Sequence, residues 1–400
     1  MLRGVYLPRA ADAGAAAMAT YGIPLLVLAT TNSSALTGAA FTLEWIPRLA
    51  AFTVAGQLVD RLGASAVFRA ATAARAVVAL AAAVVLPTQG GPIATTVVMV
   101  LAASTGVLSE VSYIAAETTG GIASQDAGER AHRVQGVLLG CDQVAGLMGP
   151  ALAGLFLQKF AATGMLIAIA GLSAAAGALA PCPHHPRPAT ARARSNGVLR
   201  GLRVGLCTLR SLPALGWLVA GLALSNLASG TLQAAAPAIV VTQLGHSTAD
   251  VGLIWSAAAA AALGTVAGCR LAISRFGLWP VIAACAAVAS SACLAVSLTH
   301  TYTGYLVLIA LLTAGEAGMT VVLRTLRSHL IPKDVFGATL SLTILLLLLP
   351  FPLAGILVAA VPPPELAHVV TGCAVAQALG LLVTVTRLRT NPALRTSTSS

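Results

Sequence analysis

Charged and aromatic residues are scarce in this chain of 400 residues. Asp, Glu, Lys and Arg together make up only 9% of the sequence and aromatic residues 4%, whereas hydrophobic residues make up 58%. So few polar side chains cannot cover a surface that faces water, and the mean hydropathy of +0.89 is typical of a chain that has lipid as its solvent. The composition therefore excludes a water-soluble globular protein.

Acidic residues are the scarcer charged type, with 12 Asp and Glu against 23 Lys and Arg, and the net charge is +11. The basic residues are scattered over short loops and do not form one face interleaved with aromatic residues, so we expect no binding to nucleic acid. They are better explained as signals that orient membrane helices, with some attraction to the head groups of anionic lipids.

Several functional signatures are missing. The seven cysteines show no CxxC or other metal-binding spacing, and most lie in apolar runs, so we expect neither disulfides nor a metal site. The sequence has no P-loop, HExxH or GxSxG motif, which argues against an enzyme and against a bound nucleotide or other cofactor. Any work that the protein does must then draw on an ion gradient.

Apolar stretches fill the chain, and twelve of them approach the ~20 residues that one helix needs to cross a bilayer core. About 20 of the 23 Lys and Arg lie in alternate gaps, and because basic residues resist translocation, these gaps are predicted to be cytoplasmic. Both termini are then cytoplasmic, and the chain is predicted to be a multi-pass protein of the inner (plasma) membrane. The predicted spans are roughly residues 10–31, 38–59, 67–87, 93–118, 134–157, 162–181, 213–241, 249–272, 278–299, 303–326, 336–360 and 366–388.

Residues 182–212 form the one long gap, and their prolines and arginines predict a cytoplasmic linker. It separates an N-terminal bundle of six helices at 1–181 from a C-terminal bundle of six at 213–390, and a cytoplasmic tail at 391–400 follows. The first apolar run is full length, so we expect it to remain as a helix and not to be cleaved as a signal peptide.

A repeat supports this division. Residues 56–63 (GQLVDRLG) lie between the second and third spans, and residues 270–277 (RLAISRFG) lie at the matching place between the eighth and ninth. Both copies keep an arginine and a final glycine. Parallel halves of this kind, related by a pseudo-two-fold axis, are typical of one large class of alternating-access transporters. The predicted fold is therefore an all-α membrane protein of two six-helix bundles.

Three segments carry recognisable motifs, at Gly56, Leu58, Asp60, Arg61 and Gly63; at Gly149, Pro150 and Gly154; and at residues 323–332. They resemble parts of the major facilitator superfamily of transporters. One resembles its loop signature, one the helix-5 signature of its exporter or antiporter branch, and one the end of helix 10 in bacterial members that export macrolides or siderophores. The resemblance implies the major facilitator fold and proton-coupled export of a small polar or amphipathic molecule, such as a drug, a siderophore or metallophore, or a secondary metabolite. An importer of a small polar metabolite and a non-transporting membrane scaffold remain as alternatives.

Asp60 in the loop signature is predicted to act as a latch. Its carboxylate can accept hydrogen bonds from the N-terminus of a neighbouring helix, and that contact must break when the two halves rock open to the cytoplasm. Arg61 and Arg69 are expected near Glu117 at the cytoplasmic end of the fourth span, where an ion pair can form. The alternative is that these residues are only solvated loop charges.

The glycines of the two signatures predict close approaches of the backbone. Gly56 and Gly63 allow helices to approach and the chain to turn tightly. Gly149 and Pro150 open the hydrogen-bond ladder of the fifth helix and allow a kink, and Gly154 extends a face of small residues. The resemblance implies that this face seals the path between the halves, and ordinary packing of small residues is the alternative.

Ionisable side chains at bilayer depth are the stronger functional signal, because a central Asp, Lys or Arg costs about 2.5 to 3.5 kcal/mol to insert. Glu44 and Arg48 are spaced i, i+4 on one helical face and can pair with each other. Asp142 can join Arg75 or lie against the first span, near Asp12. The residues of this group are Glu44, Arg48, Arg75, Glu110, Asp142 and Glu316.

The resemblance implies that helices 1, 4, 7 and 10 line a central cavity, so Glu110 and Glu316 are the acids expected to meet substrate. An acid in a wet cavity of low dielectric can bind a proton on one side of the membrane and release it on the other. Tyr113 and Asn226 are predicted to line the same cavity. We therefore expect a monomer that binds a polar, zwitterionic or chelating substrate, protons and lipid.

Thiol labelling tests the predicted topology. A single cysteine placed at Ser195, in a variant that lacks the seven natural cysteines, should react with a membrane-impermeant maleimide in inside-out vesicles and be protected in right-side-out vesicles. A cysteine at Gln89, in a gap predicted to be extracellular, is the control and should show the opposite pattern. Labelling of Ser195→Cys from the outside would contradict the topology.

Overall fold

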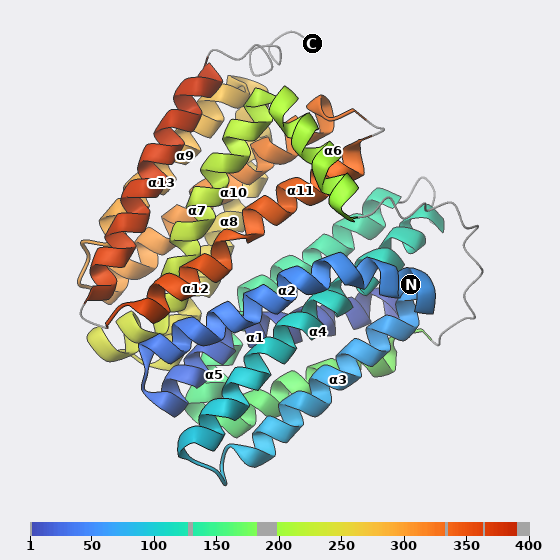
Figure 1. Cartoon of the computed structure of the whole chain (residues 1–400), viewed down its shortest axis with the longest axis vertical. Helices are drawn as coiled ribbons and strands as arrows, with labels where there is room; N and C mark the ends of the chain where they lie inside the picture. The colour runs from blue at the N-terminus through green and yellow to red at the C-terminus, as the bar shows by residue number, and fades with distance from the viewer. Residues whose placement is uncertain (1, 127–130, 182–197, 333–334, 363–364, 390–400) are drawn as a thin grey trace. The chain divides into compact units, whose positions relative to one another are not determined.

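The computed structural model describes residues 2–126, 131–181, 198–332, 335–362 and 365–389. Throughout these ranges the chain forms helices joined by short connections, and the described residues contain no strand (Figure 1). Contacts between residues divide the chain into two compact units. The first consists of Met1–Ala193 with Ala236–Ser256, and the second of Arg194–Ala235 with Ala257–Ser400.

The N-terminal helices build the first unit. They are η1 (Leu2–Tyr6), α1 (Leu7–Thr31), α2 (Ser34–Leu62), α3 (Ala64–Val85), α4 (Gly91–Asp126) and α5 (Ala131–Leu179). α1 packs along α5, α2 along α4, and α3 along both α4 and α5. Alanines occupy much of this contact, among them the fully buried Ala115 and Ala176. Such small side chains allow the helices to approach closely, which is how helices associate in lipid.

Helix α5 combines two of the predicted spans. The spans 134–157 and 162–181 form a single element of 49 residues, which is broken at Ala161, where φ is 55° and ψ is −166°. The described apolar part, Gly136–Leu179, has 44 residues, about twice the length that one crossing requires. A sharp break at Ala161 therefore replaces the loop that the sequence predicts between these two crossings.

The remaining helices belong mainly to the second unit, although η3 and the start of α8 belong to the first. They are α6 (Val198–Ser211), α7 (Pro213–Pro237), η3 (Ala238–Gln243), α8 (Thr248–Phe276), α9 (Leu278–Val296), α10 (Tyr302–Leu330), α11 (Phe336–Leu348), α12 (Pro350–Ala360) and α13 (Leu366–Arg389). α9 packs against α10 and α13, and α6 packs against α11. Pro350 divides the predicted span 336–360 into α11 and α12, because proline cannot donate to the helical ladder.

Helix α6 occupies the second half of the predicted linker. Of residues 182–212, the first part up to 197 lies outside the described residues, whereas Val198–Ser211 is helical. Gly205 and Leu209 lie on its buried face, and Gly205 comes close to the carbonyl oxygen of Ala338 in α11. The second part of the linker is therefore an amphipathic helix that packs against α11 within the second unit.

The number of crossings matches the sequence pattern. Ten of the described helical segments are long and apolar enough to cross a membrane. One of the ten is the 44-residue part of α5, which supplies two crossings, and α2 supplies a further one with 29 residues although it carries Glu44 and Arg48. The predicted all-helical fold with twelve crossings is confirmed.

The repeated loop has the same backbone form in both copies. Gly63 joins α2 to α3 with φ 86° and ψ 140°, and Gly277 joins α8 to α9 with φ 82° and ψ 174°. Only glycine occupies this region without strain, which explains why both copies end in glycine. The close approach predicted at Gly56 is wrong, because a Cβ there would have no neighbouring atom of the described chain within 4 Å.

Glycines bring the backbones of α5 and the start of α8 into contact within the first unit. A side chain on Gly154 would clash with the carbonyl oxygen of Thr248, and one on Gly252 would clash with the carbonyl oxygen of Pro150. The Thr248 hydroxyl donates to the Gly154 carbonyl at 3.2 Å. Beside Pro150, the Ala151 N–H donates to the Ser256 hydroxyl at 3.2 Å. This part of α5 therefore functions as a close packing surface.

The helix-5 signature also faces α1. Gly149 lies so close to Ala17 that a Cβ at this position would overlap the alanine side chain. At Gly146, one turn earlier on α5, a Cβ would meet no described atom within 4 Å. At the signature positions Gly149 and Gly154 a side chain would clash with a neighbouring helix, whereas at Gly146 it would not.

Valine substitutions test this packing surface. Gly154→Val should lower the thermal unfolding temperature and the yield of folded protein, because the backbone of Thr248 cannot move away without separating α5 from α8. Gly146→Val makes the same chemical change on the same helix in open space and should have little effect. Unfolding of the two purified variants, followed with a thiol-reactive dye, gives the comparison, and equal behaviour would contradict the packing role.

Candidate functional site

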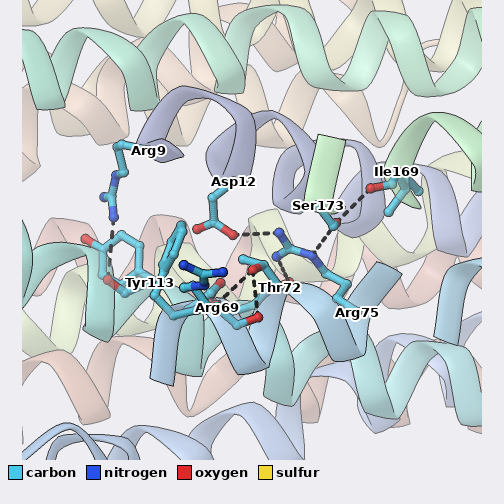
Figure 2. Close-up of polar contacts among 11 residues, drawn as sticks. Arg9, Asp12, Arg69, Thr72, Arg75, Tyr113, Ile169 and Ser173 are labelled. Carbon is cyan, nitrogen blue, oxygen red and sulfur yellow. Dashed lines mark hydrogen bonds and ion pairs between the residues drawn. The ribbon is translucent and has the colours of Figure 1, made fainter. Parts of the chain in front are cut away.

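Arg75 of α3 is fully buried and ties four helices together. Its Nη2 donates to Oδ1 of Asp12 in α1 at 2.6 Å, its Nε donates to the Ser173 hydroxyl of α5 at 2.9 Å, and its Nη1 donates to the Ser109 hydroxyl of α4 at 3.2 Å. Figure 2 shows Asp12 and Ser173 pointing toward the guanidinium group. Because every nitrogen of this group has a partner, the arrangement is suited to holding the helices in place.

Arg9 of α1 forms a second ion cluster, and only 3% of it is exposed. Its Nε and Nη2 donate to the two carboxylate oxygens of Asp142 in α5 at 2.7 and 2.6 Å. Its Nη2 also donates to Oε1 of Glu117 in α4 at 2.7 Å. The guanidinium carbon lies 4.6 Å from the centre of the Tyr113 ring. Two acids therefore share one arginine, and one of them makes the two-pronged contact for which arginine is suited.

In this cluster Glu117 has a different partner from the one predicted, and Asp142 takes one of its two predicted positions. Glu117 is expected from the sequence to pair with Arg61 or Arg69, but it binds Arg9, because the start of α1 lies closer to the end of α4 than the sequence suggests. Of the two positions expected for Asp142, the structure shows the one against the first helix. Arg9 directly precedes the first predicted span, 10–31, and the structure buries it.

Glu44, Arg48 and Glu110 form a third cluster between α2 and α4. The Arg48 Nε donates to Oε2 of Glu110 at 2.9 Å, whereas its Nη1 lies 4.0 Å from Oε1 of Glu44. Glu44 is 3% exposed, and its Oε1 accepts from the Thr20 hydroxyl of α1 at 3.0 Å. Its Oε2 is buried and has no hydrogen-bond partner among the described residues. The expected i, i+4 pair of Glu44 and Arg48 is therefore a long contact, and Arg48 makes its shorter contact with Glu110 on the neighbouring helix.

Glu316 of α10 is the acid of the second unit. Its Oε1 accepts from the hydroxyls of Ser225 and Ser229 in α7 at 2.5 and 2.6 Å. Gln377 of α13 donates from Nε2 to the Ser225 hydroxyl at 2.8 Å. Within the described ranges Glu316 forms no ion pair. The second unit therefore holds its membrane-embedded acid with hydroxyl groups, and the first unit holds its acids with arginines.

Tyr113 and Asn226 occupy different surroundings. Tyr113 is 44% exposed and lies beside Arg9. The Asn226 side chain donates to the carbonyl of Leu347 at 2.7 Å, next to the break between α11 and α12. This bond ties α7 to the end of α11, so Asn226 has at least a structural role.

The loop signature is only partly described. The side chain of Asp60 lies outside the described part of the chain, so its predicted contact with a helix N-terminus stays a prediction. Arg61 is exposed at the end of α2. Gly63 supports the turn through its backbone, as shown above.

Comparison with known proteins identifies the family. The family model described as Major Facilitator Superfamily matches residues 10–355. This range covers most of the chain, and the protein therefore belongs to the major facilitator superfamily of transporters. No curated protein sequence is significantly similar to it.

Solved structures of transporters share the fold. A mutant of the nucleoside transporter NupG superposes with a TM-score of 0.76 at 13% identity, over 95% of this chain and 98% of that one. A D-xylose-proton symporter gives 0.72 at 14%, over 99% and 98%. A bacterial homologue of the iron transporter ferroportin, in an inward-facing state, gives 0.71 at 16%, over 96% and 98%. At these low sequence identities the similarity shows the fold and does not identify a substrate.

Several site residues are not found from the sequence. Ser225 and Ser229 are spaced i, i+4 on α7, a spacing that would have placed both hydroxyls on one helical face. Arg9 and Asp12 are spaced i, i+3, but their place at the edge of the first span makes them resemble loop charges. Thr20 carries no such pattern, and only the packing of α1 against α2 shows its role.

Removal of Arg75 tests the structural cluster. Arg75→Met leaves the Asp12 carboxylate buried without its partner, which should cost about 3 to 5 kcal/mol of unfolding free energy. Adding Asp12→Leu to this variant should restore much of the loss, because the unpaired charge is then gone. The exposed Arg61→Met is the control and should change the unfolding temperature little. If the loss of unfolding free energy in the double variant equalled the sum of the losses in the two single variants, Arg75 and Asp12 would not be energetically coupled, which would contradict the pair.

Proposed function

We propose that this member of the superfamily is a proton-coupled exporter of a small polar or amphipathic molecule. The observation that carries the proposal is the cluster of Glu44, Arg48 and Glu110, in which two buried acids share one arginine. One positive charge cannot neutralise two carboxylates, and an excess negative charge inside the membrane is costly. A single proton removes that excess.

Glu44 is the acid that we propose takes the proton. Its Oε2 has no partner within the described chain, and a buried carboxylate with an unsatisfied oxygen is much less stable than a neutral carboxyl group. Glu110 instead receives the direct charged hydrogen bond from Arg48. The division of roles follows from which acid the guanidinium contacts.

Alternating access supplies a route by which the proton can be coupled to cargo. When Glu44 is protonated, Arg48 is held by Glu110 alone. When Glu44 loses the proton, Arg48 is drawn toward both acids, which lie on α2 and α4. A change of charge at this position therefore biases the packing of two helices, and coupling of transport to a proton gradient requires such a bias.

Glu316 is proposed as the second polar contact for cargo or protons. It lacks an arginine among its described partners, so it is free to bind a cationic or hydrogen-bonding group in exchange for Ser225 or Ser229. A buried carboxyl group of this kind suits a polar, zwitterionic or chelating substrate better than an apolar one. The export direction rests on the resemblance of the Gly149, Pro150 and Gly154 segment to the exporter signature and on the close packing of that segment.

Import is the second candidate. The structural neighbours include a nucleoside transporter and a D-xylose-proton symporter, and the same carboxyl clusters serve uptake if the proton and the substrate move in one direction. Transport into inside-out vesicles distinguishes the two, because a pH gradient that is acidic inside drives uptake by an antiporter and not by a symporter.

Glu44→Gln tests the proton site. Glutamine mimics the protonated acid, so the variant should fold normally but lose pH-gradient-driven uptake of a test panel, here erythromycin, desferrioxamine and ethidium, by at least about tenfold. An infrared difference spectrum between acid and alkaline buffer should also lose one band of a protonated carboxyl group. Glu365→Gln, which changes an exposed acid next to α13, is the control. Gradient-driven uptake and an infrared band that both survive in Glu44→Gln would refute the assignment.

A further inference from the structure

Arg327 near the end of α10 is buried, and the described residues leave part of its guanidinium group without a partner. Only 8% of it is exposed, and neither its Nε nor its Nη2 has a hydrogen-bond partner among the described residues. These two nitrogens lie on one edge of the guanidinium group and form the fork that binds a carboxylate or phosphate through two parallel hydrogen bonds. Arg9 and Arg75, the other deeply buried arginines of the described chain, each bind a carboxylate at 2.6 Å.

The surroundings of Arg327 supply positive charge and little negative charge. Arg324 lies one helical turn away and is exposed. The segments of the second unit, 194–235 and 257–400, contain 12 Lys and Arg but only the acids Glu316, Asp334 and Glu365. Glu316 already accepts two hydroxyl bonds, Glu365 lies before α13, and Asp334 lies outside the described residues.

We propose that Arg327, with Arg324 beside it, binds the oxyanion group of a ligand, either a carboxylate or a phosphate. The proposal deepens the proposed function, because it gives the cargo an acidic group. An unpaired guanidinium under protein cover is unfavourable, and an anion that binds when this end of the second unit opens relieves that cost. The fork is covered in the present conformation, so binding requires that opening.

Helix geometry relates this site to the other polar group of α10. Glu316 and Arg327 are eleven residues apart, which is close to three full turns and puts them on the same face of the helix about 16 Å apart. Thr320 and Leu323 lie between them on that face. The guanidinium fork of Arg327 and the carboxyl group of Glu316 therefore lie along one face of α10, with the fork nearer the C-terminal end of the helix.

Anion titrations of the full-length protein test the site without a pH gradient. The protein is placed in nanodiscs of phosphatidylcholine, and its unfolding temperature is measured against increasing inorganic phosphate and, separately, succinate, because a ligand that binds only the folded state raises this temperature. A saturable rise is expected for the natural sequence. Arg327→Gln should weaken the apparent affinity at least tenfold. Arg327→Lys should recover it only in part, because lysine keeps the charge but lacks the fork.

Control variants distinguish this site from general charge effects. Arg275→Gln removes an exposed arginine at the end of α8 and should leave the titration unchanged. Arg327→Gln is expected to fold, because it removes a buried charge whose fork has no partner among the described residues. Glu44→Gln should titrate like the natural sequence, so a failure of the proton-coupling proposal would leave this result standing.

A second set of nanodiscs, which contain phosphatidylglycerol, distinguishes a lipid head group from a soluble anion. If phosphatidylglycerol raises the unfolding temperature without added phosphate, and Arg327→Gln removes that rise, a lipid head group occupies the site. If only phosphate or succinate raises the unfolding temperature, and Arg327→Gln removes that rise, the site binds a soluble ligand. Equal titrations of Arg327→Gln and the natural sequence, or no response in either lipid, would overturn the proposal. So would a double-variant cycle in which Asp334→Asn and Arg327→Gln show the strong coupling of an internal ion pair.

Discussion

The structure depends on the pairing of charges that the membrane does not tolerate alone. In the first unit, arginines on α1, α2 and α3 are each bound by carboxylates on other helices, at distances of 2.6 to 2.9 Å. Hydrophobic contact holds helices together only weakly in lipid, so these pairs and the close contacts of glycine and alanine fix which helices meet. Arg75 has a partner for each guanidinium nitrogen and is the clearest structural member of the group.

The incomplete pairings are where function is expected. Within the part of the chain that the structure describes, Glu44 has an oxygen without a partner, Glu316 is held by two hydroxyls instead of an arginine, and Arg327 has an unpaired fork. Each is a group whose stability changes when a proton or an anion arrives. A transporter needs such groups, because a fully satisfied network would have no reason to respond to its ligand. The same reasoning separates Arg75, whose nitrogens are all bonded, from Arg48, which is shared by two acids.

The sequence predicts the positions of the helices well, but it predicts poorly which charged residues pair with each other. The glycine that ends each copy of the loop is identified from the repeat alone, and Gly63 and Gly277 have nearly the same φ. In contrast, Arg9 lies at the edge of the first apolar run, and the sequence pattern at such an edge is the same whether the residue meets water or a buried acid. Glu44 and Arg48 are expected to pair because i, i+4 residues are neighbours on one helix, yet Glu110 on another helix competes more successfully.

By itself the sequence determined that this protein spans a membrane with twelve helices, since the lengths and hydropathy of the apolar runs are properties of the chain alone. The resemblance of its motifs also led to the superfamily that the family model then confirmed. Only the tertiary structure decided which charges meet and, among the described residues, which acid keeps an unpaired oxygen and which buried arginine has no acid beside it. Those outcomes depend on the rotation and depth of each helix against its neighbours, and hydropathy does not encode either.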